Sequence, residues 1–546
     1  MSLAAMTHAA APGITGGTGT TATFNLTAQP AYLNQPDGAA IYSWGYGCNG
    51  APTGFAPAAI TAPTCNSMQV PGPTLIVTEG QTVTVNLQNG LPTAAGNTSI
   101  LFPGFNVTAT GGVRGVLTQE AAAGGTVSYT FVAISPGTHA YYSGTQGDLQ
   151  IEMGLYGAVI VLPATPPSAC TAGLPLTNPG GNATAKKFWG EGDFRLAPAA
   201  YDDAKSCYDR EYLFQWAEMD PRIYNQALAE VNDPVRTAAC TANANSLGCS
   251  LDVATEPYHP AYFIINGRSM PDDMDPNYAP EYPHQPYNGN PHLHPGEMML
   301  VRSIGQGHWQ HPFHEHANHV RILGRDGTLQ LSATDCRVNG SATGCTTDAL
   351  AGLLMFNTDT TPGEAFEGIF YFTGRGLNWD PYGHHPNDTG DPLGSLPCTP
   401  DRDGYNTGAP TAVNYFEWCQ DHNKPLEVAP FGDVPAGGPA TLPNPNIFTN
   451  GAWYGGTPYL GPDATLRGGG TQDCASTTGN TAANQASTCT DLQPSNTQAN
   501  PGSERGWAYM WHSHNEREIT TNNVFPGGML MMLLVDTREF VIDETK

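Results

Sequence analysis

The chain has 546 residues, 40% of them hydrophobic, which is enough for roughly two to four domains with substantial cores. Its 21 basic and 48 acidic residues give a net charge of −27, which repels phosphate backbones and anionic lipids and so argues against nucleic acid and membranes as partners. The most apolar run, Gly527 to Val535, is too short to span a bilayer, and no charged and apolar signal segment opens the chain.

The first region, residues 14–163, has the pattern of an all-β sandwich. Within Val70 to Leu91 a strand and a Glu-Gly turn precede an alternating segment in which Val83, Val85 and Leu87 share one face. This alternation predicts a half-buried antiparallel strand. Val127, Tyr129 and Phe131 repeat it, and an apolar run ending near Pro163 predicts a buried closing strand.

A Pro- and Ala-rich linker, residues 164–205, leads to a second region, residues 206–546. This region contains about seven short apolar segments with turn residues between them, the number expected for one sandwich. From about 376 to 504 the sequence becomes rich in Pro, Gly, Asn and Thr, which predicts a long loop-rich insertion in the second region.

The twelve cysteines lie in segments that resemble loops, and none forms a Cys-x-x-Cys motif. Taken in order along the chain they form six pairs of consecutive cysteines: Cys48/Cys65, Cys170/Cys207, Cys240/Cys249, Cys336/Cys345, Cys398/Cys419 and Cys474/Cys489. Disulfides formed in an oxidising compartment are the simplest account. We therefore expect an exported protein, periplasmic or extracellular.

Histidines gather in two short segments. HWQHPFHEHANHV, residues 308–320, holds five of the chain's 16 histidines, and HSH, residues 512–514, holds two more. Alternate residues of a strand face the same side, so His314 converges with His316, and His512 with His514. Four imidazoles on neighbouring strands suit copper, zinc, iron or nickel, with Cu(II) favoured by intrinsic affinity. A lone His-x-His can equally be a surface or hydrogen-bonded pair, but two such pairs in one predicted sandwich favour a metal.

Both segments resemble motifs of the multicopper oxidase family of laccase-like proteins. HPFHEH, residues 311–316, is similar to the family's H-P-x-H-x-H motif, and HSH is similar to its H-C-H motif. The segments Val70 to Val83 and Pro136 to Val161 resemble the opening and closing parts of its first cupredoxin domain. The resemblance implies two cupredoxin-like Greek-key sandwiches. It also implies a type 1 copper position for His311, and positions of the trinuclear copper cluster for the other four histidines: His314, His316, His512 and His514.

The chain departs from the family where the type 1 copper is expected. Ser513 stands at the position of the cysteine, and Glu518 at that of the second type 1 histidine. The axial methionine position falls at Asn523, although an insertion would let Met529 take it. A blue copper site needs a soft thiolate, which a serine hydroxyl does not replace. We expect no type 1 copper.

The first region departs from the family as well. Its four cluster-histidine positions hold other residues: Leu101, Pro103, Tyr142 and Gly144. Four histidines cannot hold three coppers without substitute ligands, so we do not expect four-electron reduction of dioxygen. We expect instead a reduced metal site at the four remaining histidines, with copper as the ion and zinc as an alternative.

Several further residues are candidates for additional ligands or for the surroundings of the site. Tyr142 could bind the metal or simply fill the vacated volume, and His311 and Glu518 could form a second site with Glu315 and Ser513 or a hydrogen-bonded polar cluster. His308 and His319 flank the motif and read more simply as outer or surface residues. The loop histidines could replace lost ligands if their loops cover the site: His292, His294, His384 and His385.

Three functions remain open from the residues. The chain could be a copper oxidoreductase that acts directly on a small-molecule substrate, a non-catalytic copper-binding or copper-sequestering protein, or a cupredoxin scaffold with a residual metal site. Two-domain members of the family tend to be homotrimers, so the resemblance also implies a homo-oligomer.

Overall fold

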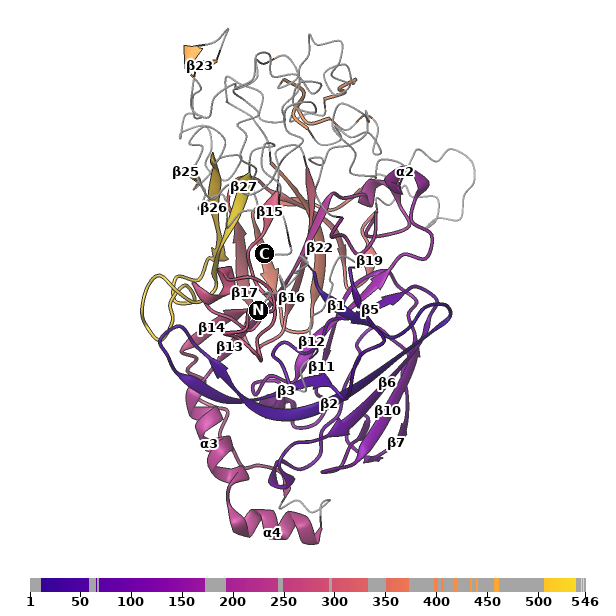
Figure 1. The fold of residues 1–546 in the computed structure, drawn as a ribbon, viewed down its shortest axis with the longest axis vertical. Coiled ribbons are helices and arrows are strands. Elements are labelled where there is room, and N and C mark those ends of the chain that lie inside the picture. The colour runs from indigo at the N-terminus through magenta and orange to yellow at the C-terminus, as the bar shows by residue number, and fades with distance from the viewer. Residues whose placement is uncertain are drawn as a thin grey trace, which may run out of the picture.

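The structure is a computed structural model with complete side chains. It describes residues 11–57, 65, 68–171, 193–243, 249–293, 297–331, 350–372, 505–536, 542 and 544, together with short stretches between 397 and 460. Most of the predicted insertion, the pairs Cys336/Cys345 and Cys474/Cys489, and His294, His384 and His385 lie outside these residues. In Figure 1 most strands of the first region, indigo to magenta, lie in the lower part and most strands of the second, pink to yellow, in the upper part.

Two five-stranded sheets form the first region. One contains, in spatial order, β3 (Ala40–Cys48), β2 (Thr21–Asn34), β6 (Thr82–Asn89), β10 (Thr126–Val132) and β7 (Thr108–Gly111). The other contains β11 (Gly137–Tyr142), β12 (Tyr156–Leu162), β5 (Leu75–Thr78), β1 (Gly13–Thr15) and β4 (Gly54–Ala56). A hairpin of β8 (Val113–Arg114) and β9 (Gln119–Glu120) and the short helices η1 (Thr93–Ala95), α1 (Gly147–Gln150) and α2 (Ser168–Thr171) complete it.

Two larger sheets form the second region. One contains β14 (Tyr262–Ile265), β13 (Arg210–Met219), β16 (Met298–Gly305), β22 (Ala365–Tyr371), β18 (Val320–Arg325) and β19 (Thr328–Leu329), with β20 (Leu354–Met355) paired to β18. The other contains β15 (His292–Leu293), β27 (Leu530–Asp536), β26 (Arg505–Ser513), β17 (His311–Glu315) and β21 (Asn357–Thr360), with β25 (Gly456–Leu460) paired to β26. Two-residue strands β23 (Asp433–Val434) and β24 (Gly438–Pro439) pair separately.

The all-β fold class is confirmed, since strands make up 43% and helices 11% of the residues that the structure describes. Every strand of the first two sheets precedes residue 163, and every strand of the other two follows residue 206. The limits of the two regions and the linker stay predictions.

The alternating segment at 82–89 is a strand, β6, whose residues alternate between buried and partly exposed as expected. Its predicted antiparallel pairing holds on one side only, because β6 runs antiparallel to β10 but parallel to β2. β2 and β6 can run in the same direction because the chain between them passes through the other sheet, in β4 and β5, before it returns.

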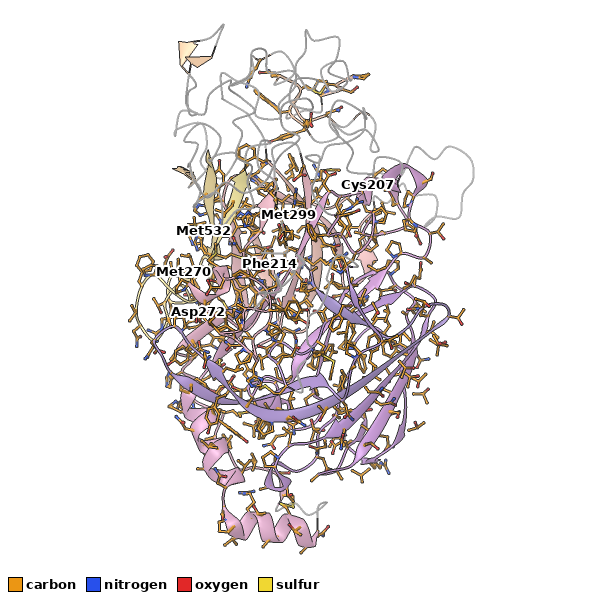
Figure 2. All side chains as sticks on the ribbon, in the orientation of Figure 1. Cys207, Phe214, Met270, Asp272, Met299 and Met532 are labelled. Atoms are coloured by element: carbon orange, nitrogen blue, oxygen red, sulfur yellow. A yellow bond between two sulfur atoms is a disulfide. The ribbon has the colours of Figure 1, made fainter. Side chains whose placement is uncertain are left out.

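An aromatic core lies between the sheets of the second region. Phe214, Phe313 and Trp511 are buried and contact one another edge to face, with ring centroids 5.7 to 6.2 Å apart. Side chains surround Phe214 and the buried Met299 in Figure 2. Because Phe313 lies on β17 and Trp511 on β26, burial of these rings fixes which faces of the two strands point into the core.

Two helices follow β13, although helical periodicity is scarce in the sequence. The helices α3 (Pro221–Val231) and α4 (Pro234–Ala242) each begin after an aspartate cap, Asp220 and Asp233, whose side chain accepts a hydrogen bond from a backbone amide of the first turn. The further 3₁₀ turns are η2 (Ala204–Ser206) and η4 (Asp272–Met274).

Four of the six expected disulfides are present among the described residues: Cys48–Cys65, Cys170–Cys207, Cys240–Cys249 and Cys398–Cys419. Each joins two cysteines that are consecutive along the chain, as predicted. Over the part of the chain that the structure describes, no helix combines the length and apolar character needed to cross a bilayer.

Candidate metal centre

The pairing of β17 with β26 brings the two histidine motifs together. His314 is the direct cross-strand partner of His512, and the neighbouring pairs are Phe313 with Ser513 and Glu315 with Trp511. Because Phe313 and Trp511 point into the aromatic core, the alternation of each strand turns His314 and His512 to the opposite face.

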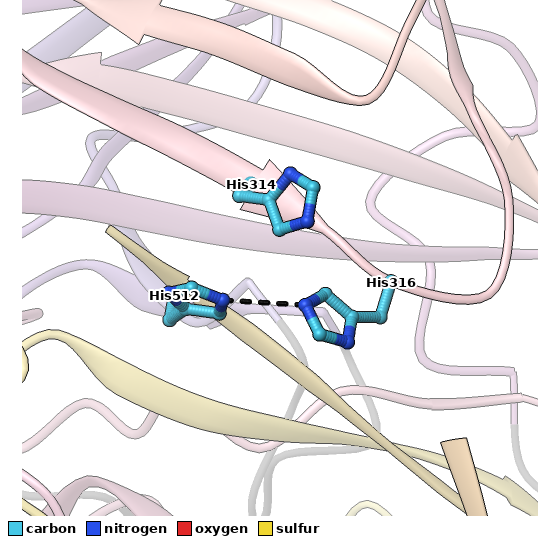
Figure 3. A group of neighbouring side chains, drawn as sticks. All are labelled: His314, His316 and His512. Carbon is cyan, nitrogen blue, oxygen red and sulfur yellow. Dashed lines mark hydrogen bonds between the residues drawn. The ribbon is translucent and has the colours of Figure 1, made fainter. Parts of the chain in front are cut away.

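Three buried histidines converge on one space at this face (Figure 3). Ring nitrogens of His314, His316 and His512 all lie within 4.8 Å of one another. The Nε2 atoms of His316 and His512 are 3.2 Å apart, and the ring centroids of His314 and His316 are 4.7 Å apart. The structure therefore groups three of the four histidines that the sequence selects.

The fourth histidine, His514, lies beside this group but is more open to solvent. Its ring centroid is 4.7 Å from that of His314 and 5.6 Å from that of His512. Its side chain is 48% exposed, whereas His314 is 1% exposed. The backbone amide of His514 donates to the carbonyl of Pro312 at 2.8 Å, which holds this end of the HSH segment against β17. A metal held by the buried three would meet solvent on the side of His514.

Burial and repulsion from neighbouring imidazoles favour the neutral form of His314 and His512. Burial, followed by the neighbouring His512 and His514, lowers the pKa of His314 to about 4. Burial also lowers the pKa of His512, although the carbonyl of Ser513 opposes the shift. A neutral imidazole has a lone pair available for a metal, so the site is set up for ligation at neutral pH.

The hydrogen bonds of His512 define which nitrogen faces the cluster. Its Nδ1 lies 2.6 Å from the carbonyl oxygen of Ser513, which can only accept, so Nδ1 carries the proton. In the neutral ring Nε2 is then an acceptor, and the 3.2 Å contact requires His316 Nε2 to donate. A metal would take the place of that shared proton between the two Nε2 atoms.

The opposite face of β17 holds a second, different arrangement around His311. Its Nδ1 is 2.8 Å from Glu518 Oε2, and its Nε2 is 2.8 Å from Glu218 Oε2, with all three side chains fully buried or nearly so. Burial alone would lower the pKa of His311, but the two carboxylates outweigh it and raise the pKa to about 9. His311 is therefore an imidazolium whose two nitrogens both donate to carboxylates.

A carboxylate network continues from Glu218 toward the first region. Glu218 Oε1 accepts from the backbone amides of His308 and Trp309 at 2.6 and 2.9 Å. Burial would raise the pKa of Glu218, but hydrogen bonds from His311 and these amides lower it instead. The hydroxyl of Tyr258 lies 3.3 Å from Glu218 Oε1 and 2.7 Å from Glu152 Oε2. Glu218 thus anchors His311 to both regions of the molecule.

Sequence reasoning did not select Glu218, Glu152 or Tyr258. Glu218 lies on β13, whose ten residues are all buried. A glutamate inside an apolar strand that is predicted to be buried is itself a signal, because a buried carboxylate needs a partner. That signal was available in the segment from Arg210 to Asp220.

The other candidates lie in different surroundings. Tyr142, on β11, is half-buried and pairs with Tyr156 and Leu101, and nothing in the described residues joins it to the histidine cluster. His319 packs its ring edge to face on Phe356, with centroids 5.1 Å apart. The ring of His308 lies against Tyr258, and its Nε2 is 3.6 Å from Glu152 Oε2. His292 is on β15, where its backbone exchanges hydrogen bonds with the hydroxyl of Tyr212.

Leu101 and Gly144, two of the first-region positions that resemble the family's cluster-histidine positions, pack against each other. A Cβ atom on Gly144 would lie 2.7 Å from Cγ of Leu101. A histidine at position 144 would not fit beside Leu101. This half of the family's cluster is therefore packed with protein.

The donor set of the histidine group fits copper. Two nitrogens that bind one ion at about 2.0–2.1 Å lie roughly 3 Å apart, close to the separation of the His316 and His512 Nε2 atoms. Neutral imidazoles are ligands that copper accepts readily. The surroundings of His311 do not fit a metal, since both of its nitrogens donate protons to carboxylates.

Part of the first region matches the model of a known protein family. Residues 57–166 match the family model described as multicopper oxidase. The predicted family resemblance is thereby confirmed. No curated protein matches the chain.

Solved copper proteins with structural similarity share little sequence with this chain. A blue copper oxidase from Nitrosomonas europaea is 13% identical, with 95% of this chain and 86% of that chain covered and a TM-score of 0.43. The multicopper oxidase mgLAC is 17% identical, with 65% and 78% covered and a TM-score of 0.39. A copper nitrite reductase from Nitrosomonas europaea is 17% identical, with 65% and 86% covered and a TM-score of 0.36.

Proposed function

We propose that the protein binds a single copper ion at His314, His316, His512 and His514 and oxidises a small molecule that reacts directly at this ion. The observation that carries the proposal is the convergence of three buried histidines with ring nitrogens within 4.8 Å of one another, two of which, His314 and His512, have a lowered pKa. The multicopper oxidase match of residues 57–166 supports copper as the ion. Bound copper would supply one-electron redox chemistry and an open coordination position.

The chain's own residues define how a substrate would meet this ion. His314, His316 and His512 are buried and hold the inner side, while His514 is about half-exposed and borders the solvent side. Because Ser513 replaces the thiolate, no type 1 copper would collect electrons from a distant donor. A reductant would therefore have to approach from the side of His514.

Non-catalytic copper binding is the alternative that the same geometry allows. Turnover separates the two functions. We also propose that the protein is exported, which is compatible with four disulfides among the described residues. A homo-oligomer, such as a trimer, stays a prediction.

The test is copper titration of metal-free protein combined with oxygen consumption in the presence of small phenolic reductants. We expect copper to bind in equimolar amount to the chain, and oxygen uptake that requires copper. Replacement of His314 by alanine should abolish both. Copper binding without oxygen uptake would establish the non-catalytic alternative, and preferential uptake of zinc would contradict copper as the ion.

A further inference from the structure

The position at which the family holds its type 1 copper is filled here by a hydrogen-bonded crosslink. Three segments meet there: β13 through Glu218, β17 through His311, and the turn that follows β26 through Glu518. His311 is 0% exposed and lies 2.8 Å from each carboxylate. We call these three residues, Glu218, His311 and Glu518, the buried triad.

The buried triad joins its segments by charge as well as by hydrogen bonds. The positive imidazolium lies between two carboxylates, and charge-assisted hydrogen bonds are about twice as strong as neutral ones. Removal of either carboxylate would leave one N–H of the buried imidazolium without its acceptor, and an unsatisfied buried donor is costly. The crosslink therefore performs, with protein groups, the joining role that a metal would have at this position.

Glu518 transmits this restraint to the HSH segment. Its Oε2 accepts the hydroxyl of Ser513 at 2.5 Å, and its Oε1 accepts the side-chain amide of Asn515 at 2.7 Å. The Ser513 hydroxyl in turn accepts from the backbone amide of Asn515 at 3.2 Å. Ser513 is fully buried, so these bonds fix its backbone as well as its side chain.

The fixed backbone of Ser513 then orients a candidate metal ligand. Its carbonyl oxygen accepts the Nδ1 proton of His512 at 2.6 Å. A histidine whose Nδ1 is held in this way must present Nε2, and second-shell hydrogen bonds of this kind set the tautomer and ring orientation of metal-binding histidines. The path from the triad to the cluster thus has two steps, Glu518 to Ser513 and Ser513 to His512.

We propose that Glu518, anchored by His311 and Glu218, is a positioning residue that acts through Ser513 to hold His512 with its Nδ1 protonated and its Nε2 directed at the histidine cluster. The substitutions at 513 and 518 that remove the type 1 copper are, on this view, a replacement for its joining role. The consequence for copper affinity rests on the proposed function, whereas the tautomer of His512 does not.

The direct test is the tautomeric state of His512 in metal-free protein. Protein labelled with ¹⁵N in its histidines gives long-range nitrogen–proton correlations that distinguish Nδ1-protonated from Nε2-protonated rings, and His512→Gln assigns the signal. We expect an Nδ1-protonated His512 in the parent chain. In Glu518→Gln and Ser513→Ala we expect a mixture of tautomers, and a copper dissociation constant raised about tenfold.

Matched variants separate positioning from folding and from charge. Ser513→Ala removes only one hydroxyl, so it keeps the test open if Glu518→Gln does not fold, and near-ultraviolet circular dichroism monitors folding in each variant. Glu281→Gln removes the same charge at an exposed position and should leave both the His512 tautomer and copper affinity unchanged.

The possible outcomes distinguish this inference from the proposed function. An Nε2-protonated His512 in the parent chain, or an unchanged tautomer in both folded variants, would overturn the inference. A tautomer that changes in the variants of a protein that binds no copper would support the inference while the proposed function fails.

Discussion

His311 and His314 lie three residues apart on the same short strand, yet their environments are opposite in charge. Carboxylates on both sides of His311 raise its pKa to about 9, whereas burial beside two other histidines lowers the pKa of His314 to about 4. One side of β17 therefore holds an imidazolium that cannot bind a metal, and the other holds a neutral imidazole that can. The identity of the residue is the same, and its neighbours decide its role.

The positions that resemble the family's copper ligands but hold other residues have two different surroundings. In the first region, Leu101 packs into the space beside Gly144, so vacated ligand positions have become apolar packing. Around His311, vacated positions have become a connected polar network instead. The chain thus has one buried charged centre and one candidate metal centre. Ser513 links the two by hydrogen bonds, and each centre can be altered by its own substitutions.

Removal of a cluster histidine should have the largest effect. We expect His316→Ala to lose copper binding, because its Nε2 shares the metal space with His512. His319→Ala is the matched control, since His319 lies on the same segment but packs on Phe356. Mass spectrometry of copper-loaded protein checks both. Equal copper content in the two variants would contradict the cluster.

Removal of the imidazolium should mainly affect folding. His311→Ala leaves Glu218 and Glu518 buried without their shared partner, and breaking a buried charged group of this kind costs about 3–5 kcal/mol. Denaturant unfolding measures the loss. His308→Ala, which removes a partly exposed ring packed on Tyr258, should cost less, about 1 kcal/mol. A similar small change in His311→Ala would show that the triad contributes little.

The same triad predicts a loss of stability at alkaline pH. The folded-state pKa of His311, about 9, exceeds its ordinary value of 6.5, so its contribution is complete below pH 6.5 and disappears as pH rises through 9. The difference corresponds to about 3 kcal/mol. Unfolding curves at pH 6 and above pH 9, compared between the parent chain and His311→Gln, measure it. An identical pH dependence in both proteins would refute the assignment.

Restoring the thiolate alone should have the smallest effect. Ser513→Cys places a sulfur beside Glu518, but both nitrogens of His311 remain engaged by carboxylates. We therefore expect copper-loaded Ser513→Cys to lack the intense blue absorption of a type 1 site. The visible spectrum is the measurement. An intensely blue protein would mean that His311 leaves its carboxylate partners and binds copper.

Much of this architecture is encoded in local sequence patterns. The alternation at Val83, Val85 and Leu87 predicts β6, and two His-x-His motifs on strands suffice to predict a shared face. Apolar periodicity does not predict the helices α3 and α4, although Asp220-Pro221 and Asp233-Pro234 each combine a capping aspartate with proline at the first helical position. The partner of β6 on its parallel side depends on a crossover, which local patterns do not contain.

The triad shows where sequence reasoning ends. The sequence marks His311 and Glu518 as possible metal ligands or outer residues, and the structure places them 2.8 Å apart. Their actual partner on the other side, Glu218, is 93 residues from His311, and the pairing arises because β13 and β17 belong to facing sheets. The charge of His311 depends on that long-range contact. No local motif carries it.

The most direct test of the whole account is the copper content, electron paramagnetic resonance spectrum and visible spectrum of one copper-reconstituted sample. The account predicts copper in equimolar amount to the chain, a type 2 resonance signal with nitrogen coupling, and no intense blue absorption. Several coppers per chain with intense blue colour would contradict it, and a protein that takes up no copper would remove the histidine cluster as its functional centre.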